Sequence, residues 1–183
     1  CCSADHRDKR LRVSVWIHWD DHSWVIDCGP DFRQQMLTSQ CQKLDGILYT
    51  HEHSDHTAGL DDIRPFFFRQ GDIPIYGHER VIKNLRQRFD YVFTEVDRYP
   101  GAPSVTVNEV VRGQAFAVGN KICEPISVKH GDLDIFGYRI GSFAYLTDVK
   151  YITPEETEKL KGLKVLVVSA LRHEPHDTHY NLE

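Results

Sequence analysis

The chain has 183 residues, of which 40% are hydrophobic and 27% are charged, as in an ordinary globular domain. No apolar run approaches the roughly 20 residues that cross a bilayer, so we expect no membrane partner. The net charge of −5 does not favour a nucleic-acid partner, because surfaces that bind nucleic acids are usually rich in Lys and Arg.

The five cysteines are odd in number and scattered along the sequence. Such a distribution is not a disulfide framework, and it predicts a reducing, cytoplasmic location. No secretory signal is visible at the start of the sequence. Four of the cysteines are expected to be small buried hydrophobic residues, namely Cys2, Cys28, Cys41 and Cys123.

Short strands and helices alternate in the first part of the chain. Period-two alternation over residues 11–19 predicts a half-buried strand, and residues 23–27 predict a second strand that forms a hairpin with it. Residues 31–37 predict a short helix, and residues 46–50 predict a short apolar strand. Residues 57–70 are expected to form short helix and loop.

A strand and a helix follow. Residues 73–77, with the sequence IPIYG, predict a strand, and Pro74 favours an edge strand or a first position. Apolar residues at a spacing of four over residues 78–91 predict an amphipathic helix. Proline and glycine interrupt residues 97–121, which are expected to hold short strands.

The last part of the chain again indicates mixed α and β structure. Residues 123–129 predict a strand, and residues 135–140 with 142–147 predict a second hairpin. Thr153 is followed by proline and then glutamate, which is typical of a helix N-terminus. Residues 164–168, with the sequence KVLVV, predict a fully buried apolar strand.

An unusual concentration of metal-binding side chains follows a short apolar strand. Residues 50–56, with the sequence THEHSDH, hold three histidines and two acidic residues. Imidazole and carboxylate groups are suitable ligands for zinc or manganese. Alternate residues of an extended segment point the same way, so His51 and His53 are expected to share one metal. Asp55 and His56 follow where the chain turns into a helix, and they are expected to face a neighbouring metal. The alternative is an ordinary polar loop.

This HxHxDH motif resembles the metallo-β-lactamase superfamily, and the resemblance covers almost the whole chain. It implies an α/β fold, an αββα sandwich of two mixed β-sheets flanked by helices, with the metals at one sheet edge. Residues 1–183 are then expected to form a single metallo-β-lactamase-like hydrolase domain that is truncated at both ends. The superfamily's last metal ligand is expected beyond Glu183.

Three more residues match the superfamily in the expected order, each at the end of a predicted strand. Asp27, in VIDCGPD, matches a buried aspartate that supports the metal loop. His130, in ISVKHGD, matches the third imidazole of the first metal site. Asp148, in AYLTDVK, matches the carboxylate that bridges both metals. The resemblance thus implies two divalent ions, zinc or manganese, held by His51, His53 and His130 and by Asp55, His56 and Asp148.

Within the superfamily, the segments IDCGPDFRQQ, THEHSDHTAGLDDIRPF, IPIYG and KHGDLDIFGYRI resemble the phosphodiesterase branch. That branch includes the cyclic phosphodiesterase of the carbon–phosphorus lyase pathway and, more distantly, tRNase Z. One of its histidines lies just before a helix N-cap and acts in catalysis. His179, two residues before Asn181, matches this histidine and is preferred over His173 and His176. The resemblance also gives Asp55 a catalytic role in holding the nucleophile.

Two further residues have weaker matches. Cys1 falls where the branch has the last of several cysteines that hold a structural zinc, so Cys1 is a candidate structural ligand. Arg64 directly follows the metal motif and is a candidate for binding a substrate phosphate through a bidentate contact. The alternative for residues 64–69 is a packed aromatic segment with a solvated arginine.

The resemblance implies a metal-dependent phosphodiesterase that uses a dinuclear-metal-bound hydroxide on a small or cyclic phosphodiester. His179 would protonate the leaving oxygen. The alternatives are an endonuclease of the tRNA 3′-processing type, a hydrolase of thioesters or lactams, and a metal-binding family member without hydrolase activity. Homodimers are common among the resembling proteins, so a homodimer stays open, although no interface is visible in the sequence.

Overall fold

The computed structural model of the chain describes residues 2–182. The expectation that Cys1 binds a structural zinc therefore concerns a residue outside the described part. The chain divides into two units, one up to Asn108 and the other from Glu109 onward. Among residues 2–182, none of the helices combines the length and apolar character needed to cross a membrane.

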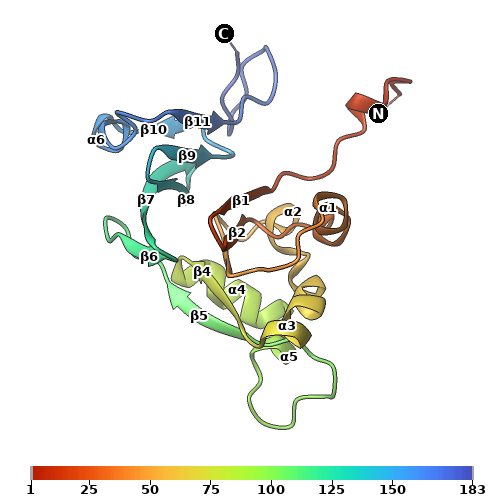
Figure 1. Cartoon of the computed structure of the whole chain (residues 1–183). Coiled ribbons are helices and arrows are strands. Elements are labelled where there is room, and N and C mark those ends of the chain that lie inside the picture. Colours follow the sequence, from red (N-terminus) through yellow and green to blue (C-terminus); the bar gives the residue numbers. More distant parts are fainter. Residues whose placement is uncertain (1, 183) are drawn as a thin grey trace. The chain divides into compact units, whose positions relative to one another are not determined.

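The first unit is built on a mixed sheet with the strand order β1-β2-β3-β4-β5. The first two strands form an antiparallel hairpin, and β3 runs parallel to both β2 and β4. The strands are β1 (Val15–Trp19), β2 (His22–Ile26), β3 (Gly46–Leu48), β4 (Ile73–Gly77) and β5 (Val105–Glu109) (Figure 1). The helices are η1 (His6–Asp8), α1 (Phe32–Ser39), α2 (Ser54–Thr57), η2 (Leu60–Ile63), α3 (Arg64–Gln70), α4 (Glu79–Arg88) and α5 (Asp90–Phe93).

Helix α4 shows how the first unit forms its core. His78 caps the helix, and its Nδ1 accepts a hydrogen bond of 3.1 Å from the backbone N–H of Arg80. The apolar side of α4 buries Val81, Ile82 and Leu85. These side chains belong to one continuous hydrophobic cluster with the central strands, so the amphipathic pattern correctly predicted which side of the helix is buried.

The second unit is built on another mixed sheet, with the order β10-β7-β8-β9-β11 and with β6 paired to β7. Strands β7, β8 and β9 are antiparallel neighbours, and β11 is parallel to β9. The strands are β6 (Phe116–Val118), β7 (Lys121–His130), β8 (Leu133–Ile140), β9 (Phe143–Leu146), β10 (Tyr151–Ile152) and β11 (Val165–Val168).

Helix α6 (Pro154–Glu158) begins where the sequence predicts. The Thr153 side chain accepts a hydrogen bond of 3.2 Å from the backbone N–H of Glu156. The Glu156 carboxylate is buried, and it accepts hydrogen bonds from the Ser127 backbone N–H at 3.0 Å and from Lys159 at 2.9 Å. The cap therefore also positions a carboxylate that holds α6 against β7.

The α/β class is confirmed, with two mixed sheets and flanking helices. Both predicted hairpins are present, and so is the predicted helix near residues 31–37. The single helix predicted over residues 78–91 is instead two helices, because α4 ends at Arg88 and Phe89, with a φ of −131°, separates it from α5. Turn residues and apolar periodicity act over a few neighbouring positions, which is why they predict these elements well.

The first predicted strand is shorter than expected, because β1 begins at Val15 and not at residue 11. The residues before it make other hydrogen bonds. The Arg12 backbone N–H donates to the Asp31 carboxylate at 2.6 Å, and the Ser14 hydroxyl donates to the Asp27 carbonyl at 2.8 Å. These bonds attach residues 11–14 to the loop before α1, so alternation alone gave the wrong strand start.

The prediction for Pro74 is wrong. Strand β4 lies between β3 and β5, and Pro74 is its second residue. The register with β3 pairs Ile75 and Tyr76 but not the proline. The missing N–H of Pro74 therefore does not interrupt that ladder, which lets a proline occupy an inner strand.

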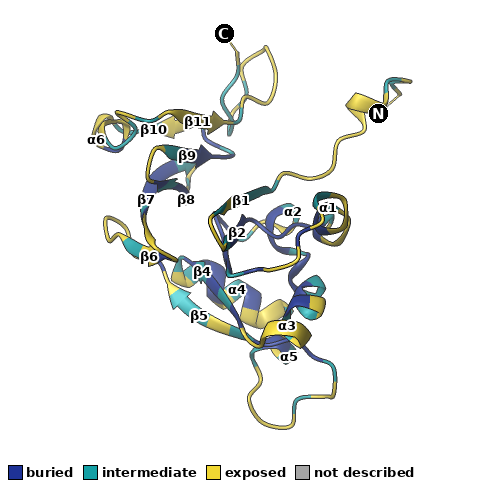
Figure 2. Ribbon diagram, viewed as in Figure 1, coloured by how far each residue is buried: buried dark blue, intermediate teal, exposed yellow. Residues whose placement is uncertain are grey.

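The predicted strand at residues 164–168 exists as β11, but its predicted burial is wrong. Its side chains are 41–50% exposed, and Figure 2 shows β11 in yellow. This strand ends the sheet order, with β9 as its neighbour. An apolar run is equally compatible with an inner strand and an edge strand, so the run itself could not predict the burial.

Three of the four predictions about cysteines are confirmed. Cys28, Cys41 and Cys123 are buried and free, whereas Cys2 is exposed. The prediction for Cys2 was wrong because it lies in the segment before β1, away from the hydrophobic clusters.

Candidate metal centre

The first group of candidate ligands lies on the loop that follows β3 and on the short helix α2. His51 and His56 are buried, whereas His53 is exposed and the Asp55 side chain is 45% exposed. The Asp55 carboxylate lies 3.8 Å from Nε2 of His56. This loop therefore presents two shielded imidazoles beside two accessible ligands.

Asp27 organises this loop from the end of β2. It is fully buried, and its backbone adopts a φ of 63°. Its carboxylate accepts hydrogen bonds of 2.8 Å from the Thr50 backbone N–H, the Thr50 hydroxyl and Nδ1 of His56. Asp27 therefore holds the loop that carries the candidate ligands, and its support of a metal site stays a prediction.

The same network determines which ring nitrogens carry a lone pair. A carboxylate only accepts, so Nδ1 of His56 is protonated and its Nε2 is the basic nitrogen. The Thr50 hydroxyl proton is directed at Asp27, so the Thr50 oxygen accepts from Nδ1 of His51 at 2.9 Å. The Nε2 atom of His51 is therefore basic as well. Both buried histidines thus have the tautomer that binds metals through Nε2.

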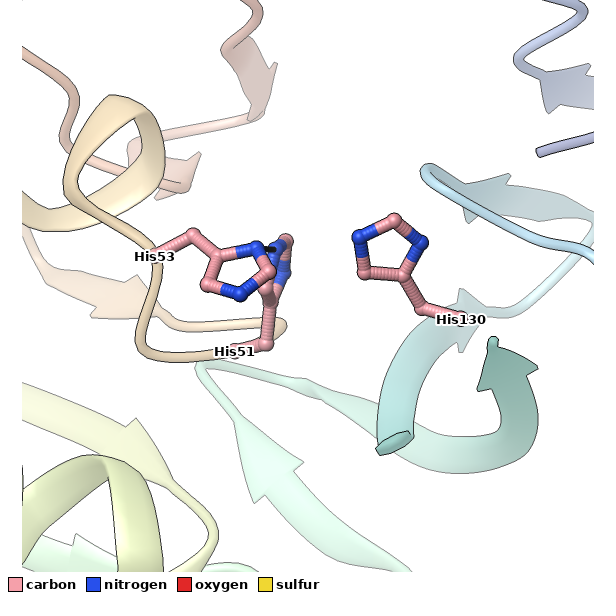
Figure 3. Close-up of side chains that lie close together, drawn as sticks. All are labelled: His51, His53 and His130. Carbon is pink, nitrogen blue, oxygen red and sulfur yellow. Dashed lines mark hydrogen bonds between the residues drawn. The ribbon is translucent and has the colours of Figure 1, made fainter. Parts of the chain in front are cut away.

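These residues fit a divalent cation by the chemistry of their donors. Figure 3 shows the imidazoles of His51 and His53, whose Nε2 and Nδ1 atoms lie 3.0 Å apart. Two imidazole nitrogens on one tetrahedral zinc would lie about 3.3 Å apart, given zinc–nitrogen bonds of about 2.0–2.1 Å. A cation shared by these nitrogens would replace the proton between them. A carboxylate that fixes an imidazole from behind is also typical of metal sites.

Two glycines let the loop approach the end of β2. A Cβ atom on Gly29 would lie 2.2 Å from the Asp55 carbonyl oxygen, and one on Gly59 would lie 2.1 Å from the Gly29 carbonyl oxygen. The Cys28 backbone N–H donates to the His56 carbonyl at 2.8 Å across this contact. Any larger residue at either glycine would force the loop away from Asp27.

Two uncharged groups, the Cys28 thiol and the Tyr49 phenol, lie near the Asp27 carboxylate. Burial raises the pKa of the Cys28 thiol well above its usual value, and burial also raises the pKa of the neighbouring Tyr49 phenol. Both groups therefore stay protonated at neutral pH. The Asp27 carboxylate then lies beside uncharged groups on this side of the loop.

The second unit carries the other candidate residues. His130, drawn on β7 in Figure 3, lies at the end of that strand, and its Nδ1 donates to the Thr178 carbonyl at 2.9 Å. A carbonyl only accepts, so Nε2 of His130 is the basic nitrogen. Asp148 follows β9 with a φ of 53°, and its backbone N–H donates to the Ser169 hydroxyl at 2.9 Å.

His179 lies among the candidate residues of the second unit. Its Nδ1 is 3.6 Å from the Asp148 carboxylate, and its ring centroid is 4.7 Å from that of His130. The His176 ring lies 4.9 Å from His179 on another side, and its Nδ1 accepts from the Thr178 backbone N–H at 3.2 Å. His173 is exposed. The catalytic role of His179, and its preference over His173 and His176, stays a prediction.

Arg64 is engaged by its own loop. Its guanidinium donates to the Asp61 carboxylate at 2.8 and 3.1 Å and to the Tyr99 hydroxyl at 3.2 Å. Its role as a phosphate-binding residue stays a prediction, and a substrate would have to compete with Asp61 for the guanidinium.

The sequence reasoning missed two residues that fix ring orientation. Thr50 links Asp27 to His51, and the signal for it was a hydroxyl residue directly before the motif. Thr178 acts on His130 through its backbone carbonyl. A carbonyl acceptor carries no side-chain signature, so no sequence pattern could have indicated it.

Comparison with known proteins gives the family. The profile of the Beta-lactamase superfamily domain matches residues 22–183. A crystal structure of a diphosphatase from the PhnP family is 40% identical, with a TM-score of 0.89 over 100% of this chain and 69% of that chain.

Two relatives are longer than the chain. An octanoyltransferase of Porphyromonas gingivalis is 41% identical over 100% of this chain and 37% of its own length. A ribonuclease Z of Bacillus licheniformis is 31% identical over 64% of this chain and 38% of its own length. The chain thus spans less than two fifths of the length of these curated relatives. With its HxHxDH motif and the Asp27 support, the chain belongs to the metallo-β-lactamase superfamily, within its phosphodiesterase branch.

Proposed function

We propose that the chain is the metal-binding part of a phosphodiesterase that hydrolyses a small or cyclic phosphodiester. The observation that carries this proposal is the hydrogen-bond network of Asp27, Thr50 and His56. It presents basic Nε2 atoms on two buried imidazoles, next to the accessible His53 and Asp55. Such an arrangement has a clear use in binding a divalent cation.

The ligands are assigned to two ions, zinc or manganese. His51, His53 and His130 would hold the first ion, Asp55 and His56 would hold the second, and the Asp148 carboxylate would be shared by both. When bound, two such ions supply an activated water and neutralise charge on phosphoryl oxygens. A phosphodiester suits this chemistry because it offers an oxygen to the ions and one leaving alcohol.

The chain's own residues supply orientation and a proton. Asp27 and Thr50 hold the imidazoles in their binding tautomers. Asp55 would orient the attacking nucleophile, and His179 would donate a proton to the leaving oxygen. The Asp148 carboxylate lies 3.6 Å from Nδ1 of His179, so a proposed metal ligand and the proposed proton donor are neighbours.

The relatives support phosphorus–oxygen bond cleavage over the other reactions of the superfamily. The diphosphatase is 40% identical and is matched along the whole of this chain. The ribonuclease Z likeness supports a second candidate, a tRNA 3′-processing-type endonuclease, but the net charge of −5 disfavours binding to a long polyanion. We do not propose octanoyl transfer, because the match covers 37% of that protein and the candidate metal ligands suit hydrolysis by an activated water.

We further propose a small phosphodiester as the partner and the cytoplasm as the location. Arg64 is the proposed phosphate-binding residue, released from Asp61 when substrate arrives. That the chain forms a homodimer stays a prediction. The alternative function is that of a metal-binding family member without hydrolase activity.

The test is a substrate panel with the zinc- or manganese-loaded protein. The panel contains an aryl phosphodiester, a diester of diphosphate, a phosphomonoester, a thioester and a β-lactam. We expect metal-dependent cleavage of the phosphodiester, abolished in His53→Ala and lowered about 10²–10⁴-fold in His179→Ala. His6→Ala is the matched control, because this imidazole is 93% exposed, and it should keep full activity. Cleavage of the thioester or lactam alone would reject the phosphodiesterase assignment.

A further inference from the structure

We propose that two arginines of α4, Arg80 and Arg88, are positioning residues that hold the ligand loop from behind and thereby set its metal affinity. This inference rests on the proposed function for the identity of the ligands. It concerns residues outside the motif, on the amphipathic helix α4.

The geometry begins with a stripe along α4. Arg80, Asn84 and Arg88 are spaced by four residues, so their side chains follow one side of the helix. Their span of eight residues corresponds to about 12 Å of helix. This side differs from the one that buries Val81 and Leu85. The helix is therefore fixed by its apolar side and can serve as a rigid support for the loop.

Arg80 holds the first part of the ligand loop. Its Nε donates to Oε1 of Glu52 at 2.6 Å, and the two side chains are 36% and 18% exposed. Glu52 lies between His51 and His53, so this ion pair fixes the residue that separates two proposed ligands. The buried Oε2 of Glu52 has no hydrogen-bond partner among residues 2–182. Loss of Arg80 would therefore leave a largely buried carboxylate without its cation, which is strongly unfavourable.

Arg88 holds the last part of the loop. Its Nη1 donates to the Thr57 hydroxyl at 2.7 Å, to the Glu52 carbonyl at 3.5 Å and to Asn84 at 3.2 Å. The Thr57 hydroxyl in turn donates to the His53 carbonyl at 2.9 Å. One guanidinium thus connects both ends of the segment that carries His53.

The loop is consequently held from two directions. Asp27 fixes His56 directly and His51 through Thr50. Arg80 and Arg88 fix the backbone that carries the accessible ligands. Ligand preorganisation raises affinity because fewer conformations are lost on binding. Without the arginines, His53 and Asp55 would explore positions that do not converge on an ion.

The experiment measures zinc affinity by competition with a chelator, in wild type, Arg80→Gln and Arg88→Gln. Residues that orient metal ligands typically change affinity by about 10–100-fold, and we expect a loss of about 10-fold in each variant. Arg86→Gln is the matched control, since Arg86 lies on the same helix over the Phe93 ring at 4.9 Å. It should change affinity less than about 2-fold.

Three additional readouts separate positioning from general stability. Arg80→Lys should recover most of the affinity, because an ammonium can also pair with Glu52. The double variant Glu52→Gln with Arg80→Gln should lower the zinc affinity little more than either single change does. Amide exchange of residues 53–57 in the metal-free protein should accelerate in Arg80→Gln and Arg88→Gln but not in Arg86→Gln.

The outcomes distinguish this inference from the proposed function. Zinc affinity equal to wild type in both arginine variants would overturn it, even if their melting temperatures fall. Unchanged amide exchange in all variants would also overturn it. If zinc binds and weakens as expected but no phosphodiester is cleaved, the inference stands and the proposed reaction fails.

Discussion

Asp27 has a left-handed backbone conformation, with a φ of 63°, and lies at the point where β2 meets the ligand loop. Its carboxylate accepts hydrogen bonds from the Thr50 backbone N–H, the Thr50 hydroxyl and Nδ1 of His56. At the scale of single residues, this carboxylate orients two imidazoles without having to bind a metal itself.

Asp27→Asn tests this role. Asparagine tolerates a left-handed backbone, so the fold of the loop should persist. Its amide nitrogen cannot accept and the charge is lost, so at least one of the three donors loses its acceptor. We expect zinc affinity to fall about 10–100-fold and the free energy of unfolding to fall by about 2–4 kcal/mol. Chelator competition and urea titration measure the two effects.

Asp97→Asn is the control for that change. Asp97 also has a positive φ, of 55°, but it is exposed and lies outside the metal loop. It should alter neither zinc affinity nor stability. Equal losses in both variants would mean that the backbone conformation, and not the carboxylate, is responsible.

At this scale, the sequence could predict the candidate ligands better than the groups that hydrogen-bond to them. The spacing in THEHSDH predicts His51, His53, Asp55 and His56 as candidate ligands, because metal chemistry restricts residue type and position together. The Thr178 carbonyl and the Ser169 hydroxyl act through contacts between distant segments. Those contacts depend on tertiary structure, which no local pattern encodes.

At the scale of elements, helix starts and hairpins could be predicted, whereas burial could not. Thr153 shows the first case, since its hydroxyl accepts from the N–H three residues later. Strand β11 shows the second, since its apolar side chains are 41–50% exposed. Capping is a local interaction, but the burial of a strand is decided by what packs against it.

Thr153→Ala measures the energy of the α6 cap. The variant loses the acceptor for the Glu156 N–H, and we expect the free energy of unfolding to fall by about 1 kcal/mol. The loss should come with weaker protection of the Ser127 amide, because that N–H donates to the Glu156 carboxylate. Urea titration and amide exchange test both results.

Thr157→Ala is the neighbouring control. The Thr157 hydroxyl donates to the Thr153 carbonyl within the same exposed helix, and its removal should cost less than the removal of the cap. If both variants lose the same stability, the cap has no special role.

At the scale of the whole molecule, both units contain a buried thiol whose pKa is raised by burial, Cys28 in the first and Cys123 in the second. Unfolded thiols lose their protons above about pH 8.5, whereas the folded ones keep theirs. Unfolding then releases protons, so stability falls as pH rises above that value. Above that pH, each thiol should lower the free energy of unfolding by about 1.4 kcal/mol for every increase of one in pH.

Urea titrations at pH 8, 9 and 10 check this dependence. Cys28→Ala and Cys123→Ala should each flatten the alkaline decline, while Cys2→Ala, at an exposed position, should behave as wild type. A decline that is unchanged in both buried-cysteine variants would assign it to other groups. Tyr49, whose pKa is also raised by burial, adds to the decline above about pH 10.

The α/β class and the superfamily could both be predicted, because the residues at the strand ends follow one order along the chain. Which strands share a sheet could not be predicted in the same way. The sheet of the first unit and that of the second are separate hydrogen-bonded systems, and apolar periodicity reports on each strand but not on which sheet contains it.

The central proposal is that His51 and His53, whose Nε2 and Nδ1 atoms lie 3.0 Å apart, hold the same ion. The most direct measurement is the zinc content per chain after dialysis, for wild type, His51→Ala, His53→Ala and the double variant. The account predicts that each single variant loses one equivalent of zinc and that the double variant loses no more than either. Losses that add in the double variant would contradict it, because His51 and His53 would then serve separate ions.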